Sequence, residues 1–283
     1  MAADGAAVTA VDLTSAIGRL GLADKIVEMH VSLKSFPRIE GGPAALVEAF
    51  LCSGCTVVMW TSAHEAFRVP APPADRPHRN GVDYAAEDAQ ADAVPWPGMS
   101  DIYDETRTET DAWLGVTPAY VARRPDRVRS KRPVGNVSAV GPHARQVIAA
   151  ETEEDVFGPL RALAATRDGL VLLMGVSLTR MTILHLAEVE AGRRPFIHWA
   201  RRSDGQVAQY MAGACSQGFD NLADDLANHE TQTTVGGSCW RLYQASDAVR
   251  IAAAAIRRTP SITHCPDPTC IECADAIAGG PTD

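Results

Sequence analysis

The sequence predicts an α/β fold: a single layered domain over residues 1–283, with a central mixed sheet flanked by helices. Strand-like apolar runs alternate with helical patterns along most of the chain. The run Gly169–Val176 is almost continuously apolar, as expected of a strand buried on both faces. A helical pattern that begins near Thr179 follows it. A long Pro-rich acidic insertion at about 68–100 and a cysteine-rich tail at about 260–280 are the two appendages of this domain.

The expected elements follow in chain order from periodicity and from turn residues. Helices are predicted at 9–20, at 44–51 after Pro43, at 115–124, from Pro142, from near Thr179, at 217–228 and at 246–258. Strands are predicted at 25–31, 56–60, 136–140 and 239–243, with a hairpin of 196–202 and 206–211 around the turn Ser203-Asp204-Gly205. We expect the 68–100 insertion to be a loop or flap without its own core, either functional or merely solvated.

Composition and charge exclude some classes of partner. The formal net charge of −9 disfavours nucleic acid, because phosphate contacts need clustered Lys and Arg. An acidic surface suits a cationic ligand, although it also serves solubility. No apolar run approaches the roughly 20 residues of a membrane span, and Met1–Ala10 lacks the pattern of a signal peptide. We therefore expect a cytoplasmic protein with no membrane partner.

The helix after the central strand carries a candidate catalytic pair. His185 and Glu188 lie three residues apart and therefore share a helix face. An imidazole is a base near neutral pH, and a neighbouring carboxylate orients it or holds a cationic substrate. The alternative is a histidine satisfied within an apolar core.

A second candidate site is the strand tip Ser32–Ser35 ahead of Gly41-Gly42. Backbone N–H groups and the Lys34 cation at such a tip can bind phosphate. A polar surface loop is an equally good interpretation. We discount Cys52 and Cys55 as a redox or metal pair, since they flank a helix-to-strand glycine turn without a partner pair nearby.

The tail predicts a zinc site. The odd count of seven cysteines argues against a disulfide framework. The spacing of Cys270 and Cys273 is that of a zinc knuckle, and Cys215 with His264 would complete four ligands. Cys265 in place of His264 is the alternative, and free cysteines are the competing interpretation. A closed site of four ligands would be structural and would pin the tail to the body.

Several motifs keep their order over roughly residues 10–260. They are His30-Val31-Ser32-Leu33-Lys34-Ser35, Gly41-Gly42, Gly54-Cys55-Thr56-Val57-Val58-Met59, Arg129-Ser130-Lys131-Arg132-Pro133, Ala139-Val140-Gly141-Pro142 and Met181-Thr182-Ile183-Leu184-His185-Leu186-Ala187-Glu188. Together they resemble the aminoglycoside 3-N-acetyltransferase family. Some members also have a His-x5-Cys-x2-Cys tail with an upstream cysteine, which supports the zinc prediction.

The resemblance implies an acetyltransferase that moves an acetyl group from acetyl-coenzyme A to the 3-amino position of a cationic aminoglycoside antibiotic, and so confers resistance. It implies His185 as general base with Glu188 as its neighbour. It places acetyl-coenzyme A at His30, Ser32, Leu33, Lys34, Ser35, Arg129 and Ser130, and the acceptor at Asp104, Thr182 and Glu188. A homodimer is also compatible with it.

The sequence departs from the family pattern near the expected acceptor. Arg132 replaces the family's histidine before proline, Gly135-Asn136 replaces His-Ser, and Met181 replaces asparagine. An arginine there favours a substrate with a carboxylate or phosphate. Two alternatives therefore stay open: a coenzyme A-dependent acyltransferase for another amine of secondary metabolism, and a noncatalytic binding relative.

Overall fold

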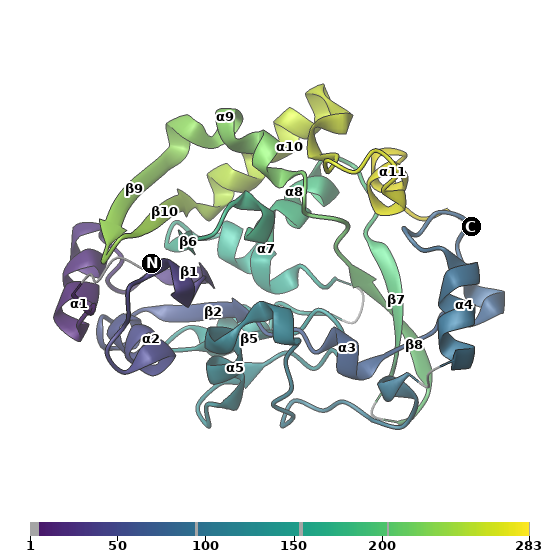
Figure 1. Cartoon of the computed structure of the whole chain (residues 1–283), viewed down its shortest axis with the longest axis horizontal. Coiled ribbons are helices and arrows are strands. Elements are labelled where there is room, and N and C mark those ends of the chain that lie inside the picture. The colour runs from purple at the N-terminus through teal and green to yellow at the C-terminus, as the bar shows by residue number, and fades with distance from the viewer. Residues whose placement is uncertain (1–5, 94–95, 153–154, 203, 283) are drawn as a thin grey trace.

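A seven-stranded mixed sheet forms the centre of the protein (Figure 1). The computed structural model describes residues 6–93, 96–152, 155–202 and 204–282. The strand order is β4-β5-β2-β1-β6-β10-β9, where β2, β1 and β6 are parallel and the outer strands are antiparallel. The strands are β1 (Ile26–Val31), β2 (Thr56–Trp60), β4 (Val128–Arg129), β5 (Val137–Val140), β6 (Gly169–Met174), β9 (Glu230–Val235) and β10 (Ser238–Gln244).

Strand β6 shows why the sheet forms here. Its side chains alternate between the two faces, so that Leu170, Leu172 and Met174 enter one apolar cluster while Val171 and Leu173 enter the other. Burying each of these side chains stabilises the fold by about 1.5–3 kcal/mol. A strand buried on both faces needs a helical layer on each, and the α/β class with a mixed sheet flanked by helices is confirmed.

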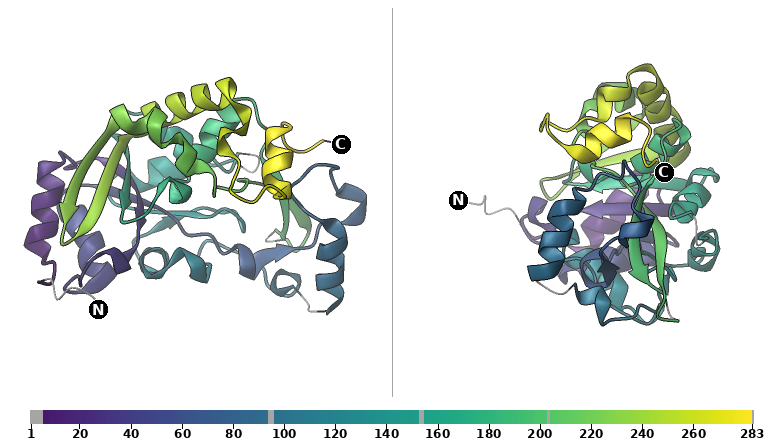
Figure 2. Two further views of the ribbon diagram at one scale, coloured as in Figure 1. Left: turned by 45° about the horizontal axis from the view of Figure 1, so that its top comes forward. Right: turned by 90° about the vertical axis from the view of Figure 1, so that its right-hand side faces the viewer.

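The two helical layers cover opposite faces of the sheet (Figure 2). One layer consists of α1 (Ala10–Arg19), α2 (Gly42–Cys52) and α5 (Val116–Arg123). The other consists of α6 (Ala144–Ile148), α7 (Gly158–Ala164), α8 (Ile183–Glu190), α9 (Ala223–Leu226) and α10 (Ala245–Arg258). Helix α8 packs against α10, so it is held between the sheet and a neighbouring helix.

A smaller antiparallel sheet lies at the other end of the molecule from α1 (Figure 1). It contains β3 (Arg68–Val69), β7 (Phe196–Arg201) and β8 (Val207–Ala212), in the order β3-β7-β8. The predicted hairpin is confirmed as β7 paired with β8. Of its predicted turn, Ser203 lies outside the described residues. The short helices α3 (His64–Phe67) and α11 (Ile271–Ile277) lie at the same end.

The prediction of an unstructured insertion at 68–100 was wrong. The segment contributes β3 to the small sheet and forms the helix α4 (Tyr84–Ala93). Glu87 of α4 is buried and its carboxylate pairs with the Arg68 guanidinium at 2.5 Å, so an acidic helix is anchored by an ion pair. Residues 94–95, including Pro95 of the proline-rich pattern, lie outside the described residues.

The other differences between the predicted and the observed secondary structure concern short elements. The predicted helix at 217–228 is divided into the 3₁₀ turn Phe219–Leu222, the α9 turn and a further 3₁₀ turn, Ala227–His229. Strand β9 and helices α7 and α11 were not predicted. In the described part of the chain, no helix combines the length and the apolar character needed to cross a membrane.

Candidate active site

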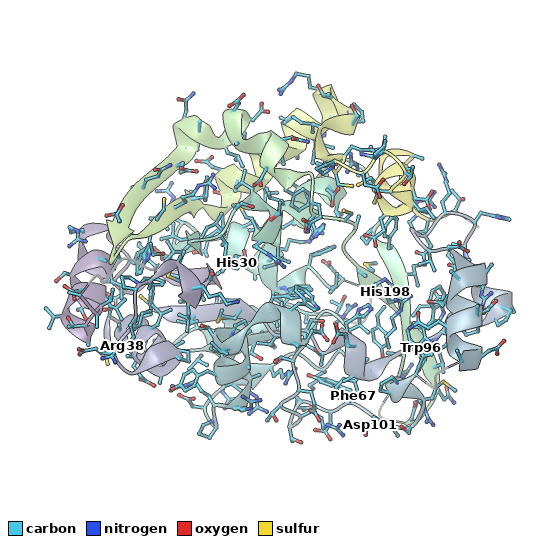
Figure 3. All side chains as sticks on the ribbon, viewed as in Figure 1. His30, Arg38, Phe67, Trp96, Asp101 and His198 are labelled. Atoms are coloured by element: carbon cyan, nitrogen blue, oxygen red, sulfur yellow. The ribbon has the colours of Figure 1, made fainter. Side chains whose placement is uncertain are left out.

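A cleft of about 980 Å³ opens at the carboxyl ends of β1, β2 and β6. In open α/β sheets, ligands bind at this edge of the parallel strands. The cleft extends from the main sheet, which carries His30, to the small sheet, which carries His198 (Figure 3). Its walls include segments that directly follow the parallel strands, namely Ser32, Leu33 and Lys34 after β1, Ser62 after β2, and Gly175, Val176, Ser177, Thr179, Arg180, Met181 and Thr182 after β6.

The predicted pair of His185 and Glu188 forms, and His185 lines this cleft, whereas Glu188 lies behind it and is not among the lining residues. Nδ1 of His185 lies 2.8 Å from a carboxylate oxygen of Glu188, and the two side chains are 12% and 7% exposed. The second Glu188 oxygen accepts a hydrogen bond from the Arg193 guanidinium. Arg193 in turn donates to the Thr263 hydroxyl at 2.8 Å. With Nδ1 bound to the carboxylate, Nε2 is the nitrogen left to accept a proton.

Aromatic rings surround the His185 imidazole. Its centroid lies 4.9 Å from that of Phe219 and 6.4 Å from that of Phe157. The ring is therefore packed on its sides and bound at one nitrogen, which limits its rotation. Thr182, predicted at the acceptor site, lines the same cleft and caps the start of α8.

The loop after β1 contributes three of its four predicted coenzyme-binding residues to the cleft: Ser32, Leu33 and Lys34. The fourth residue, Ser35, does not line the cleft. Its hydroxyl donates to the Ser32 carbonyl at 2.7 Å and shares a hydrogen bond of 2.7 Å with Ser238. Ser35 also occupies the space beside Gly175, where an added Cβ would lie 2.0 Å from the Ser35 hydroxyl. Its side-chain contacts shape the loop, and coenzyme binding by Ser35 stays a prediction.

Arg129 and Ser130 are also absent from the cleft surface. The buried Arg129 guanidinium donates to the carbonyl oxygens of Thr61, Arg107 and Glu109 at 2.6–2.9 Å. The Ser130 hydroxyl accepts the Val137 N–H at 2.8 Å. These bonds fix the backbone behind the cleft, and coenzyme binding by Arg129 and Ser130 stays a prediction.

Two predictions about the acceptor end are corrected. Asp104 is exposed and accepts hydrogen bonds from Thr106, and it does not line the cleft. Arg132 is buried, donates to the Thr152 carbonyl at 3.0 Å and lies over the Tyr210 ring. Arg132 therefore fixes the loop to β8 and does not present a cation to a substrate carboxylate.

Sequence reasoning missed a second histidine–carboxylate pair. Glu28 and His30 are two residues apart on β1, and a carboxylate oxygen of Glu28 lies 3.1 Å from Nε2 of His30. The side chains are 1% and 9% exposed, and His30 lines the cleft. The signal was a Glu-x-His spacing inside an otherwise apolar strand, which puts both side chains on one face.

A pair of histidines at the small-sheet end was also missed. The rings of His64 and His198 lie 4.5 Å apart between centroids, and both line the cleft. Burial, together with the nearby Arg68 cation, lowers the pKa of His64 to about 4. These imidazoles are therefore neutral groups near pH 7, available as hydrogen-bond partners to a bound molecule.

The tail brings four cysteines together. The sulfur atoms of Cys215, Cys265, Cys270 and Cys273 all lie within 4.8 Å of one another. The backbone N–H of Cys265 donates to the Cys273 sulfur at 3.3 Å. His264 is not part of the group, since its Nδ1 lies 2.8 Å from the Cys265 carbonyl oxygen. The geometry therefore favours the alternative set with Cys265 over the predicted set with His264.

This chain is similar in sequence to one family of known proteins. The sequence profile of the aminoglycoside 3-N-acetyltransferase family matches residues 29–257. The chain is 28% identical to aminoglycoside N(3)-acetyltransferase VIII of Streptomyces fradiae over 193 residues, which cover 66% of this chain and 63% of that relative. The match thus spans less than two thirds of the relative's length.

Solved structures share the fold. The apoenzyme of the aminoglycoside acetyltransferase AAC(3)-IVa superposes with a TM-score of 0.75 at 24% identity, covering 98% of this chain and 99% of that one. A binary complex of AAC-IIIb with CoASH gives a TM-score of 0.71 at 20% identity, with 89% and 97% of the two chains covered. At this identity the likeness establishes the fold, including the mixed sheet and its helical layers.

The raised pKa of Glu151, in the loop behind the cleft, predicts that the stability of the protein depends on pH. Burial raises the pKa of Glu151 from 4.5 to about 7, although the Arg132 cation opposes the shift. A carboxyl whose pKa is raised by folding adds stability that is complete below pH 4.5 and is lost as the pH rises through 7. We expect wild type to lose about 3 kcal/mol of unfolding free energy, relative to Glu151→Gln, between pH 4.5 and 8.

Urea denaturation of both proteins across that pH range measures the difference. Glu190→Gln is the matched control, because Glu190 is a largely exposed carboxylate paired with Arg161. Parallel stability curves for wild type and Glu151→Gln would contradict the assignment.

Proposed function

Because this chain belongs to the aminoglycoside 3-N-acetyltransferase family, we propose that it transfers the acetyl group of acetyl-coenzyme A to an amine of an aminoglycoside, with His185 as general base. One observation supports this most strongly: His185, bound by Glu188, lines the same cleft as the Ser32–Lys34 loop. A base and a coenzyme loop in one cleft allow both substrates to be held together, which supplies much of the rate of a direct transfer.

The proposed reaction is a direct acyl transfer. The amine nitrogen forms a bond to the thioester carbonyl carbon, and an electron pair moves onto the carbonyl oxygen. Nε2 of His185 takes the amine proton. The oxygen pair then re-forms the carbonyl as the C–S bond breaks, and the leaving thiolate of coenzyme A takes the proton back from Nε2 of His185, which regenerates the base. Glu188 holds Nδ1 of His185, so the ring keeps the tautomer that this step needs.

Coenzyme A would lie along the loop after β1. The exposed Lys34 offers a cation, and the 3₁₀ turn Leu33–Ser35 offers backbone N–H groups. These are the donors that bind phosphates at such turns. The solved relative in complex with CoASH supports the assignment of this co-substrate.

A second candidate acceptor is a different amine. Two positions at which the sequence departs from the family pattern, Gly135 and Met181, line the cleft. Changes at cleft positions alter the shape that an acceptor must fit. Thiol release with a non-aminoglycoside amine alone would select this candidate. Tight antibiotic binding without any thiol release would select a noncatalytic binding protein.

Replacing His185 tests the general base. His185→Ala is expected to lower turnover by about 10²–10⁴-fold, because it removes the group proposed to take the amine proton, while coenzyme A binding stays unchanged. The assay is thiol release from acetyl-coenzyme A with a panel of aminoglycosides, together with mass spectrometry of the product. His143→Ala removes an exposed imidazole outside the cleft and is the control. Full turnover in His185→Ala would end this proposal.

Gly213 provides a test of ring placement without removing the imidazole. A Cβ added at Gly213 would lie 2.7–2.9 Å from three atoms of the His185 ring, so the ring would have to move. A displacement of about 1 Å costs roughly 10²-fold in rate. We expect Gly213→Ala to lose about that much turnover in the same assay. Gly18→Ala, where an added Cβ meets nothing within 4 Å, is expected to keep full activity, and equal rates for both variants would refute the idea.

We further propose that the four cysteines bind a structural zinc ion. Four sulfurs within 4.8 Å of one another fit tetrahedral thiolate coordination, and an N–H donor to Cys273 supports a thiolate there. When bound, zinc would join α11 to the Cys215 segment and stabilise the tail. It would have no role in acyl transfer, because a closed four-ligand site leaves no position for substrate.

The zinc content of variants distinguishes the set of four cysteines from the predicted set in which His264 replaces Cys265. We expect about one zinc ion per chain in the wild-type protein. Cys265→Ser should lose most of this zinc, while His264→Ala should keep it. Elemental analysis of purified protein measures both, and Cys239→Ser, an exposed cysteine outside the cluster, is the control. Loss of zinc in His264→Ala alone would restore the original Cys3His assignment.

A further inference from the structure

An aromatic ring and a guanidinium lie together at the surface of the cleft. Trp113 belongs to the 3₁₀ turn Ala112–Leu114, which leads into α5, and Arg180 belongs to the 3₁₀ turn Leu178–Arg180, which leads into α8. The guanidinium carbon of Arg180 lies 5.9 Å from the centroid of the Trp113 ring, and both residues line the cleft. Because α5 and α8 belong to different helical layers, the contact joins two separate segments of the chain.

Neither side chain is buried or otherwise paired. Trp113 is 54% exposed, and in the described part of the chain Arg180 is the one partner of its ring. Arg180 is exposed as well, and its guanidinium has no ion pair or hydrogen bond with any described residue. A cation over an aromatic ring attracts only weakly at an exposed position. A bound molecule can therefore take the place of either partner without opening the fold.

The turn that carries Trp113 is held in place from behind. Asp111, shortly before it, is buried, and its carboxylate accepts the backbone N–H groups of His64 and Glu65 at 3.1 and 2.8 Å. The Asp111 carbonyl accepts the Leu114 N–H at 3.1 Å. These bonds tie the turn to the segment that follows β2. The indole is therefore presented from a fixed backbone, which preorganises a surface for a planar ligand.

The exposed cations of the cleft suit phosphate. Lys34 and Arg180 both line the cleft, and neither side chain has an ion-pair partner among the described residues. An arginine binds phosphate through two parallel N–H donors. Coenzyme A carries its phosphates next to an adenine ring, and nucleic-acid bases stack on aromatic side chains. An indole beside a guanidinium therefore matches both parts of the nucleotide end of coenzyme A.

We propose that Trp113 and Arg180 form the subsite for the nucleotide end of acetyl-coenzyme A. The adenine ring stacks on the Trp113 indole, and the Arg180 guanidinium pairs with a phosphate of the same nucleotide. No covalent bond is made or broken at this subsite. The inference rests on the proposed function for the identity of the acetyl donor, and it assigns residues outside the loop after β1.

An aminoglycoside fits this subsite less well than the nucleotide does. It is a polycation, and Arg180 would repel it from the ring on which it would have to stack. Its amine must also reach His185, whose ring packs against Phe157 and Phe219. The nucleotide takes no part in the reaction, so its subsite can lie apart from the base. Binding energy from such a remote part of a substrate holds the reacting group in place.

Removing the indole tests the stacking. Trp113→Ala should raise KM for acetyl-coenzyme A by about 10–100-fold, the usual effect of losing one base stacked on an aromatic side chain, with kcat changed less than about twofold. Acetyl-pantetheine carries the same thioester without the nucleotide, and its kcat/KM should be the same for both proteins. Trp113→Phe keeps an aromatic face and should keep most of the affinity. The matched control is Met99→Ala, because Met99 is also 54% exposed and does not line the cleft.

Removing the guanidinium tests the phosphate contact. Arg180→Ala should raise KM for acetyl-coenzyme A by roughly tenfold, and the difference from wild type should shrink as salt is added, because salt screens exposed charges. The kinetics with acetyl-pantetheine should again be unchanged. Arg250→Ala removes an exposed arginine outside the cleft and is the control.

A binding measurement is independent of turnover. Adenosine 3′,5′-bisphosphate carries the adenine of the coenzyme with two phosphates and no thioester arm. Its binding to wild type should quench tryptophan fluorescence as the adenine stacks on the indole. The chain contains five tryptophans, so the difference between wild type and Trp113→Phe isolates one ring. Equal quenching in the two proteins, or none in either, would overturn the proposal even if Trp113→Ala failed to fold.

The outcomes separate this inference from the proposed function. If no amine gives thiol release while adenosine 3′,5′-bisphosphate binds and quenches Trp113, the proposed function fails and the nucleotide subsite stands. If wild type transfers the acetyl group and Trp113→Ala keeps the wild-type KM for acetyl-coenzyme A, the subsite alone fails. A raised KM for the amine, with that for acetyl-coenzyme A unchanged, would assign the ring to the acceptor and would equally overturn the inference.

Discussion

The parallel pairing of β1 with β6 is the constraint on which the rest of the structure depends. It aligns His30 with Leu173 and Val31 with Met174, although these residues are about 140 positions apart in sequence. Just beyond the pairing, the Ser32 N–H donates to the Met174 carbonyl at 3.0 Å. The loop after β1 and the turn into α8 therefore leave the sheet side by side. A cleft lined by both the Ser32–Lys34 loop and the His185 imidazole follows directly from this register.

Features encoded within a few residues could be predicted from the sequence. The apolar run at β6 and the helix after it are local patterns, and the spacing of His185 and Glu188 on that helix fixes their distance without any tertiary information. The hairpin of β7 and β8 could likewise be predicted, from its turn residues and from the strand-like runs on either side of them. The resemblance to a family added the order of motifs, which the family profile over residues 29–257 then confirmed.

Features decided by long-range contacts could not be predicted. Helix α4 has an acidic, weakly amphipathic sequence, and what anchors it is Glu87 meeting Arg68, nineteen residues earlier. Arg129 matched a motif thought to bind the coenzyme, yet its two terminal NH₂ groups donate to three backbone carbonyls. Cys265 joins the other three cysteines while Nδ1 of its neighbour His264 lies against a backbone carbonyl, and spacing alone does not distinguish two adjacent residues.

The two histidine–carboxylate pairs differ in what surrounds the carboxylate. Glu188 has a second cation, because Arg193 donates to its other oxygen. Arg193 also donates to the Thr263 hydroxyl, so the group that holds Glu188 is itself held. Glu28 has no such second cation among the described residues, and its ion-pair contact is Nε2 of His30 at 3.1 Å. A carboxylate that is itself hydrogen-bonded fixes the orientation of the imidazole that it binds, and this condition is met at His185 and not at His30.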